Sequence, residues 1–308
     1  MTDGSPARGR RSYDRLAYLP YLIPGLLLFV GVIAIPFAMN IGISFTSWPG
    51  VGTPEWIGLE NYRELAGDSE FWASFRHNAA LVVGMSIVPA AIGLVMAAAL
   101  TDVIDRRFGP RAASVLRACI YLPQLLPVVV AGIVWSWILA PEDGAANAFL
   151  ALIGLDSLAH DWLGDPKTAM WSVVVVMIWF QIGFPLVIFM SGMQRVEPAL
   201  YEAAEIDGAS WWRRFWHITI TQIRPEIFVV LLITTIYSLK SFPQIYVLTK
   251  GGPGGATNVP SYYSYQNFFE KTEVGYGASI ATTLTLITIV LAIGFIRVQR
   301  RTEGDTPQ

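Results

Sequence analysis

The three histidines are the first candidates for chemistry, because imidazole serves as a general base and as a metal ligand. His77, His160 and His217 lie far apart, and none has a Cys or a carboxylate at the spacing of a catalytic or metal-binding motif. Cys119 is the single cysteine, which excludes an internal disulfide and any multi-cysteine metal site. We therefore expect no catalytic residues and no metal, and a small apolar packing role for Cys119.

Nucleotide and nucleic-acid chemistry are also not expected of this chain. No Gly-x-x-x-x-Gly-Lys-Ser/Thr motif occurs, so the chain does not hydrolyse ATP itself. The run GGPGG at residues 251–255 lacks a following Lys-Ser/Thr and predicts a flexible loop rather than a phosphate cradle. Arginines alternate with tryptophans at residues 211–216, but an amphipathic interface helix explains them better than nucleic-acid binding.

One polar stripe has the residue types and spacing to bind a solute. Its members recur every three or four residues in an otherwise apolar segment, so on a helix they share one face: Thr234, Tyr237, Lys240, Ser241 and Gln244. Such a stripe in a membrane helix faces protein or a water-filled cavity. We expect it to line a translocation path and to hydrogen-bond a hydroxylated solute, and Lys240→Leu to reduce uptake sharply. The alternative is that Lys240 only extends toward the outer surface.

Other polar and aromatic residues leave two interpretations open. An unpaired Gln181 in lipid would be costly, so we expect it to face a neighbouring helix, with contact to solute as a second possibility. Trp135, Trp137 and Trp171 fit an interfacial belt or packing better than a sugar platform. Residues 142–167 predict a surface helix that either meets a solute-binding protein or lies on the membrane.

The composition indicates that a membrane-embedded helical bundle positions these residues. The chain has 308 residues, of which 54% are hydrophobic and only 14% charged, and its mean hydropathy is +0.48. These values exclude an ordinary soluble domain and predict an all-α integral membrane protein. A cleaved signal peptide is not favoured, because the first apolar run is too long and lacks a clean cleavage site.

Apolar runs long enough to cross the bilayer predict a six-span transmembrane bundle over residues 18–298. The spans are expected at about residues 18–45, 78–100, 115–139, 169–193, 226–248 and 277–296. Prolines inside them predict kinks, at Pro89, Pro123, Pro127 and Pro185.

Arginine placement predicts the orientation of the bundle. Fifteen of the 21 Lys and Arg residues, all of them Arg, fall in the segments 1–15, 102–117, 194–224 and 297–308, on one side of a six-span topology. The positive-inside rule puts this side in the cytoplasm. We therefore expect a cytoplasmic N-terminal tail, residues 1–17, and a cytoplasmic C-terminal tail, residues 299–308.

The longest mixed segment between two spans runs from Glu197 to Pro225 and predicts two short helices joined by a bend. Pro198 suits a helix start and Asp207-Gly208 a helix stop, while Ser210 can cap the second helix. The aromatic residues that follow suit a segment at a membrane surface.

This segment resembles the EAA loop of permease subunits of bacterial ABC importers, through Glu202-Ala203-Ala204, Gly208, Ile218 and Ile220. In that family the loop is a bent cytoplasmic coupling helix that inserts into a cleft of the ATPase. The resemblance implies that residues 197–220 couple to an ATPase through Glu202, Ala203, Ala204, Asp207 and Gly208. Thr221 stands where the family usually has Pro, so the return to the membrane is expected four residues later, at Pro225. The alternative is an amphipathic connector with an accidental Glu-Ala-Ala.

Three further segments, residues 56–65, 121–147 and 248–257, resemble carbohydrate-type permeases of the maltose and glycerol-phosphate kind. The Gly-Gly-Pro turn after the fifth span is typical of the first of two unlike permeases. The resemblance implies a type I importer fold and import of a carbohydrate, polyol or sugar phosphate. It also implies a second permease as hetero-dimer partner, two copies of an ATPase that bind ATP and Mg, an extracellular or periplasmic solute-binding protein, and surrounding lipid in a bacterial inner membrane.

Two hypotheses of other classes compete with this one. An ion-coupled secondary transporter predicts acidic residues within the spans and internal repeats. No Asp or Glu lies centrally in any predicted span, which argues against it. A membrane scaffold would not need the polar stripe. Only the importer requires an ATPase and a second permease that co-purify.

Overall fold

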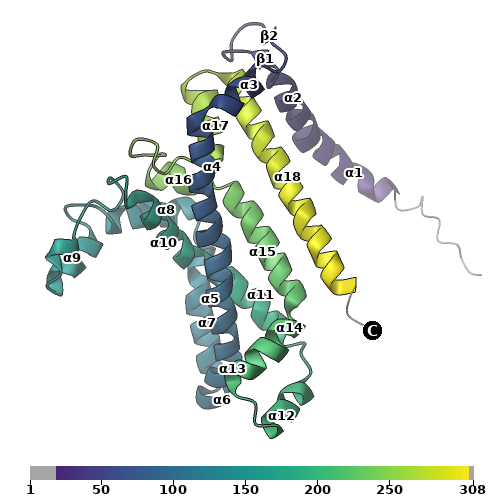
Figure 1. The fold of residues 1–308 in the computed structure, drawn as a ribbon, viewed down its shortest axis with the longest axis vertical. Helices are drawn as coiled ribbons and strands as arrows, with labels where there is room; N and C mark the ends of the chain where they lie inside the picture. Colours follow the sequence, from purple (N-terminus) through teal and green to yellow (C-terminus); the bar gives the residue numbers. More distant parts are fainter. Residues whose placement is uncertain (1–18, 305–308) are drawn as a thin grey trace, which may run out of the picture.

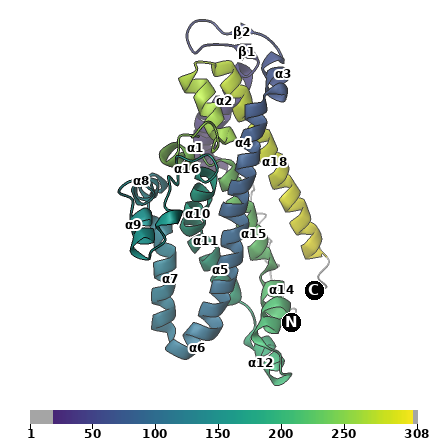
Figure 2. The same ribbon diagram turned by 60° about the vertical axis from the view of Figure 1, so that its left-hand side comes forward.

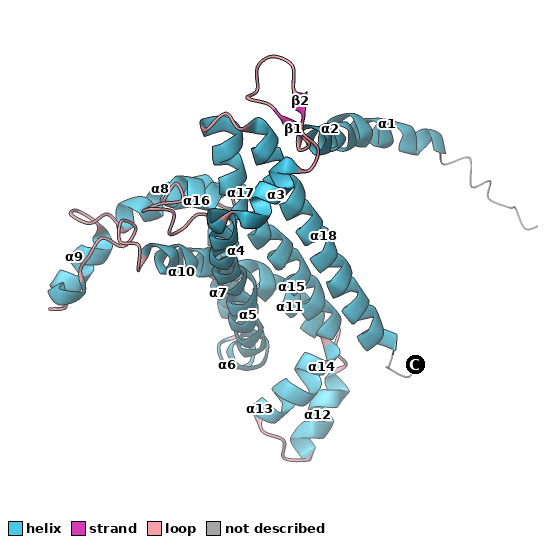
Figure 3. Ribbon diagram, turned by 45° about the horizontal axis from the view of Figure 1, so that its top comes forward, coloured by secondary structure: helices cyan, strands magenta, loops and turns pink. Residues whose placement is uncertain are grey.

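The computed structural model describes residues 19–304, so the predicted tail at residues 1–17 and the last four residues lie outside it. Figure 1 shows helices that run roughly along the long axis of the molecule, with the termini of α1 and α18 on one side. Figure 3 shows that regular structure is almost entirely helical, apart from two short strands at one end. The prediction of an all-α bundle is confirmed.

The first span comprises α1 (Leu19–Phe29), a π-helical turn (Val30–Ala34) and α2 (Ile35–Ile43). It leads away from the rest of the molecule (Figure 1). None of its apolar window Tyr21–Ile43 is buried. Its link to α18 (Val274–Gly304) includes Asn40, whose Nδ2 donates to Ala278 O (3.3 Å) and Thr282 Oγ1 (3.0 Å).

The two strands, β1 (Thr46–Ser47) and β2 (Glu55–Trp56), form an antiparallel ribbon beside α3 (Glu60–Gly67). Asn61 anchors this end by donating to the carbonyls of Ser44 and Thr46, each at 2.9 Å. The ribbon lies at the end of the molecule that the arginine pattern predicts to be outside (Figure 1).

The helix that contains the second predicted span begins before residue 78, because helical structure is continuous from Ser69 to Ile104. Asp68 caps this helix, since Oδ1 accepts from the amides of Glu70 (2.8 Å) and Phe71 (3.2 Å). Along this helix lie α4 (Ser69–Val82), a π-turn (Val83–Ile87), α5 (Val88–Ala99) and a second π-turn (Leu100–Ile104), followed by α6 (Asp105–Phe108).

The third predicted span is broken rather than kinked. The helices α7 (Pro110–Leu125) and α8 (Val128–Ile138) meet at 96°. Leu126 is extended (ψ 139°), the conformation that a following proline favours, and Pro127 has no amide to continue the hydrogen-bond ladder. The chain then projects sideways as α9 (Ala145–Leu152) and a 3-10 turn (Asp156–Leu158), which confirms a helix within residues 142–167.

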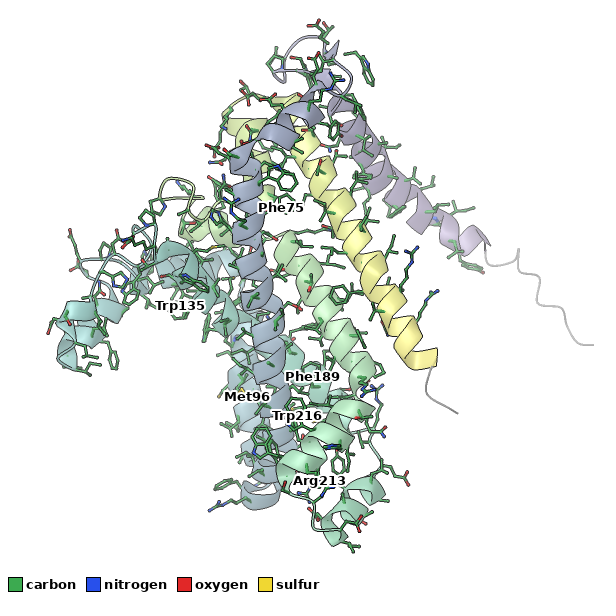
Figure 4. The ribbon with its side chains drawn as sticks, viewed as in Figure 1. Phe75, Met96, Trp135, Phe189, Arg213 and Trp216 are labelled. Atoms are coloured by element: carbon green, nitrogen blue, oxygen red, sulfur yellow. The ribbon has the colours of Figure 1, made fainter. Side chains whose placement is uncertain are left out.

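The centre of the bundle is the fourth span, α10 (Ala169–Gln181) and α11 (Gly183–Met193). It is the most buried candidate span, at 61%. Gly93 lets α5 approach it closely, because a Cβ there would lie 2.9 Å from Pro185 Cβ and 3.0 Å from Leu186 N. Apolar clusters fill the bundle on either side of this span: one contains Met177, and another contains Phe189, which is labelled in Figure 4.

The fifth predicted span is not one helix. It consists of α15 (Arg224–Leu239) and α16 (Pro243–Leu248), with residues 240–242 between them. Residues 249–259 lead to α17 (Pro260–Tyr265) and a π-turn (Gln266–Glu270), and α18 completes the described chain.

By length and composition, four helices of residues 19–304 can cross a membrane, and two bent pairs bring the number to six. One bent pair is α7 with α8. The other joins Trp211–Gln222 to α15 at 72°, a bend that the sequence did not predict at this place. Figure 2 shows α6, α12 and the end of α18 toward one end of the molecule, as the arginine pattern requires.

Candidate functional sites: a polar pocket and a helical elbow

A pocket of about 340 Å³ lies where α7, α8, α10, α11 and α15 meet. Neutral amide and phenol groups supply its polarity among apolar side chains. Its lining residues are Gln124, Leu126, Val128, Phe180, Gln181, Phe184, Ile233 and Tyr237.

Gln181 lines this pocket, and its side-chain oxygen is paired with a group on a neighbouring helix. It is 5% exposed, and its Oε1 accepts from Gln124 Nε2 at 3.2 Å. The same Nε2 donates to Phe180 O at 2.9 Å. The prediction that Gln181 faces a neighbouring helix is confirmed. Gln124 was missed by the sequence analysis, although a lone glutamine between Pro123 and Pro127 in an apolar run is a signal that could have found it.

Tyr237 also lines the pocket and is 42% exposed. Its hydroxyl accepts a long hydrogen bond from Gln244 Nε2 (3.4 Å). Gln244 therefore reaches the pocket only through Tyr237. The structure brings together Gln181 and Tyr237 of the predicted path and adds Gln124.

The other members of the predicted stripe do not share one helical face, because α15 ends at Leu239. Lys240 is the exposed C-cap of α15, and Ser241 is buried in the break. Neither lines the pocket. Thr234 is buried against α4 and α5, where its hydroxyl pairs with that of Ser86 at 2.7 Å. The single stripe is thus a wrong prediction, with the break in the helix as its cause.

Polar groups accumulate at this break. Ser238 O accepts from the amide of Ser241 (3.1 Å) and from Asn78 Nδ2 (3.3 Å). Ser261 Oγ donates to Ser241 O at 2.7 Å. The backbone groups freed by the interrupted helix are in this way taken up by α4 and α17.

The second site is an elbow formed by α12 (Pro198–Ile206) and α13 (Trp211–Arg214), continued by a π-turn (Phe215–Thr219) and α14 (Ile220–Gln222). Gly208 adopts φ +72°, a conformation in which residues with a side chain are strained. The amides of Gly208 and Ala209 donate to Glu205 O (3.0 Å) and Ala204 O (2.9 Å) and close α12. The predicted stop at Asp207-Gly208 is confirmed.

The second arm of the elbow starts and ends as predicted. Ser210 caps α13 through Oγ, which accepts from the amide of Arg213 at 3.4 Å. Thr221 continues the helix to Gln222, and α15 begins at Arg224 with Pro225 in its first turn. The next helix therefore begins beside Pro225, where Thr221 led us to expect the return to the membrane to start.

Side-chain contacts hold the two arms of the elbow together. Arg214 forms an ion pair with Glu205, and the hydroxyls of Tyr201 and Thr219 lie 3.0 Å apart. Burial raises the pKa of Tyr201, so its phenol stays protonated and able to donate. At the base, an ion pair between Arg195 and Glu226 joins the end of α11 to the start of α15. The elbow can therefore move as one unit.

The predicted coupling residues lie on the outer side of this elbow. Glu202, Ala203, Asp207 and Gly208 are exposed, and Ala204 is half-buried. Ile206, an apolar residue that the sequence patterns did not single out, is 87% exposed beside them. A hollow of about 290 Å³ separates the arms and is lined by Ala204, Asp207, Ala209, Arg213, Arg214, His217 and Ile218.

The glycine-rich loop at the opposite end is tied down rather than flexible. Thr257 Oγ1 donates to Gly252 O at 2.8 Å and pairs with Thr249 Oγ1 at 2.7 Å. The carbonyl of Asn258 lies 2.9 Å from His77 Nδ1. Within residues 19–304, no three His, Cys, Asp or Glu side chains gather as metal ligands would.

The family model described as "Binding-protein-dependent transport system inner membrane component" matches residues 89–303. A probable ABC transporter permease protein of Pyrococcus horikoshii is 34% identical over 288 residues, covering 93% of this chain and 97% of the relative. A probable starch degradation products transport system permease protein of Thermoanaerobacterium thermosulfurigenes is 32% identical over 276 residues, covering 90% and 91%.

A solved structure has the same fold. It is a chain of a bacterial alginate ABC transporter in complex with an alginate pentasaccharide-bound periplasmic protein, with a TM-score of 0.78 and 21% identity. The match covers 93% of this chain and 94% of that chain.

Proposed function

This chain belongs to the family of binding-protein-dependent transport system inner membrane components and is a permease subunit of an ABC importer, and we propose that its solute is a carbohydrate or polyol. The observation that carries the proposal is the pocket of Gln124, Gln181 and Tyr237. Amides and a phenol donate to and accept from hydroxyl groups without a charge. A starch-product permease among the relatives supports the same solute class.

A sugar phosphate fits this half of the path less well. A phosphate requires a cationic partner, and no Lys or Arg is among the residues that line the pocket. Lys240, in the break at the end of α15, is the nearest cation in sequence to Tyr237. We propose that Gln124, Gln181 and Tyr237 contact the solute, with Lys240, Ser241 and Gln244 shaping the path at the break.

The proposed assembly contains partners for each face of the chain. A second, unlike permease completes the cavity, and a solute-binding protein docks at the end that carries β1, β2 and the glycine-rich loop. Two ATPase subunits bind ATP and Mg²⁺ in the cytoplasm, one of them against the elbow. The exposure of Glu202, Ala203, Asp207 and Gly208 on the elbow supports this docking. The chain itself needs no cofactor for this role.

The proposed location is a bacterial inner membrane with both termini in the cytoplasm. Its support is the common end at which the arginine-bearing segments 102–117 and 194–224 lie (Figure 2).

The proposed mechanism follows from the elbow and the bent helices. Closure of the ATPases on ATP moves the elbow as one unit, and Arg195–Glu226 passes the motion to α11 and α15. These helices line the pocket, so the pocket opens outward when the ATPases close and inward after hydrolysis. The coupling requires two packed arrangements that ATP and solute both bias.

The test is uptake of neutral sugars by the complete complex in proteoliposomes. We expect uptake to require internal ATP and the loaded binding protein, and Gln181→Leu to lower it about tenfold, because an unpaired buried group costs about 1–3 kcal/mol. An ion-coupled secondary transporter is not favoured by the family. Uptake driven by an ion gradient without ATP would overturn the proposal.

A further inference from the structure

The segment from Trp211 to Gln222 lies across the end of a membrane helix. It is bent by 72° from α15 at Ile223, where the helix that starts with Arg224 and Pro225 begins. If α15 runs near the membrane normal, the segment lies within about 20° of the membrane plane. It therefore meets the bilayer where the hydrocarbon gives way to headgroups.

Side chains on this segment divide into three faces rather than one aromatic cluster. The face toward the bundle is buried, with Phe215, Thr219 and Ile223 at 3%, 2% and 1% exposure. Trp211 belongs to it, since its ring stacks on Phe215 with centroids 5.3 Å apart.

The second face exposes two tryptophans one helical turn apart. Trp212 is 56% exposed and Trp216 is 60% exposed. Both rings meet Phe215 edge-on, so they are held in place by the buried face. An indole has an apolar body and one N–H donor, which suits the boundary between acyl chains and headgroups.

The third face is basic. Arg213 and His217 are exposed, and the sequence from Trp211 to Arg224 contains no Asp or Glu. Figure 4 shows Trp216 nearer the membrane-spanning helices and Arg213 nearer the free tip of the elbow. Arg214 does not contribute to this face, because it is paired with Glu205.

We propose that Trp212 and Trp216 insert into the headgroup boundary of the bilayer, and that this contact is the fixed point about which the elbow moves. An anchored arm converts the push of the ATPase on α12 into movement of α15. Without this membrane contact, the elbow is displaced along the membrane surface, and less of the movement of α12 reaches α15. The inference rests on the permease function and on the cytoplasmic placement of the elbow.

Site-directed spin labelling of the assembled transporter in phosphatidylcholine/phosphatidylglycerol liposomes tests the placement. A Cys119→Ser background carries a single label through Trp216→Cys or Arg213→Cys. We expect the label at 216 to collide with oxygen about threefold more than with a water-soluble nickel complex, and the label at 213 to show the reverse. A label at 216 that favours the nickel complex, or that is sealed against both by a partner subunit, overturns the proposal.

Activity tests the mechanical part. We expect ATP hydrolysis stimulated by the loaded binding protein to fall about fivefold in Trp212→Ser/Trp216→Ser and less than about twofold in Trp212→Phe/Trp216→Phe, because Phe keeps the apolar contact. Equal activities of the two double variants overturn the anchor. ATP-dependent sugar uptake by the unaltered complex in the same liposomes tests the proposed function separately, so the two failures are distinguishable.

Discussion

At the scale of single residues, the pocket depends on a pair of glutamines that satisfy each other. A buried amide without a partner costs more than a formed hydrogen bond contributes, so the position of Gln124 is constrained by Phe180 O and Gln181 Oε1. The pair also fixes α7 against α10 at the point where α7 ends. The proposed solute contact and the packing of α7 on α10 therefore use the same groups.

Gln124→Leu removes the donor to both acceptors. We expect sugar uptake to fall about tenfold or more while the complex still assembles, because the pocket loses one amide and leaves another unpaired. Uptake assays in proteoliposomes measure it, with Gln194→Leu, an exposed C-cap glutamine outside the pocket, as the matched control. Equal uptake by both variants would remove Gln124 from the path.

Lys240 offers a second residue-scale test, because it is a cation at the C-terminal end of α15. We expect Lys240→Leu to reduce uptake sharply while the complex assembles. The alternative role is stabilisation of the helix end, worth about 0.3–1 kcal/mol. Normal uptake with a slightly lower melting temperature would assign Lys240 to that structural role.

Asp68 joins three elements at the outer end of the bundle. Oδ1 caps α4, and Oδ2 accepts from the hydroxyls of Tyr263 (2.7 Å) and Tyr276 (2.6 Å). Burial works to raise the pKa of Asp68, but the hydrogen bonds from the two tyrosines and two backbone amides outweigh it and hold the pKa below its ordinary value.

A depressed pKa predicts acid sensitivity at this end. The stabilisation by the Asp68 carboxylate is complete above the unfolded pKa of about 3.9 and is lost as the pH falls through the lower folded pKa. We expect Asp68→Asn to melt at lower temperature than the unaltered protein at pH 7, with the difference shrinking below about pH 4. Thermal melts of the purified complex across this range measure it. A difference that is independent of pH would show that only the shape of Asp68 matters.

At the scale of elements, the turn, the caps and the contacts between the two arms all favour one angle of the elbow. Gly208 supplies the left-handed turn, Ser210 starts the second arm, and the contacts Arg214–Glu205 and Tyr201–Thr219 brace the two arms. In the proposed mechanism, motion of α12 reaches α15 only if the angle between the two arms is kept. The turn at Gly208 is therefore the part of the elbow most open to disruption.

Gly208→Val should uncouple ATP hydrolysis from uptake. A β-branched residue in the left-handed region is strained by about 1–3 kcal/mol, and relief of that strain changes the angle of the elbow. We expect the complex to keep its subunits but to lose most of its sugar-stimulated ATP hydrolysis. Gly154→Val is the matched control, since Gly154 has φ +76° against +72° and the same open surroundings on the side projection. Equal losses in both variants would show that strain alone, not the elbow, is responsible.

At the scale of the whole molecule, burial is graded from the centre outward. The fourth span is 61% buried, the last 28% and the first not at all. Apolar side chains on the outer spans are exposed within this chain, as expected of a subunit that shares them with lipid and partners. In the proposed assembly, the pocket is likewise one side of a larger cavity.

Affinity purification of the tagged chain in mild detergent tests this assembly. We expect a second permease and an ATPase to co-purify in a ratio of about one to one to two, because the proposed assembly contains two unlike permeases and two ATPase subunits. The variant Gln124→Leu serves as a control, since it should keep the same subunits. A tagged chain that elutes alone and still transports would contradict the assembly.

The sequence by itself determined the helical bundle and the elbow, because each depends on local chemistry, and it predicts the orientation through its arginines. Apolar runs predict spans, arginines predict the cytoplasmic side, and Pro198, Gly208 and Ser210 act within their own turns. The start of a helix could be predicted from local sequence only where its capping residue was recognised. The cap at Asp68 was not recognised, so the start of this helix at Ser69 was not predicted.

Only the tertiary structure decided which polar residues meet. Helical spacing assigned Lys240 and Ser241 to the face of Tyr237, but the contacts that α4 and α17 make with the break allow the helix to end at Leu239. The pairing of Gln124 with Gln181 joins residues 57 positions apart. The 96° bend at Pro127 brings α8 across the bundle. Periodicity describes neighbours along one helix, whereas a pocket is formed by the ends of several helices, whose relative placement depends on packing.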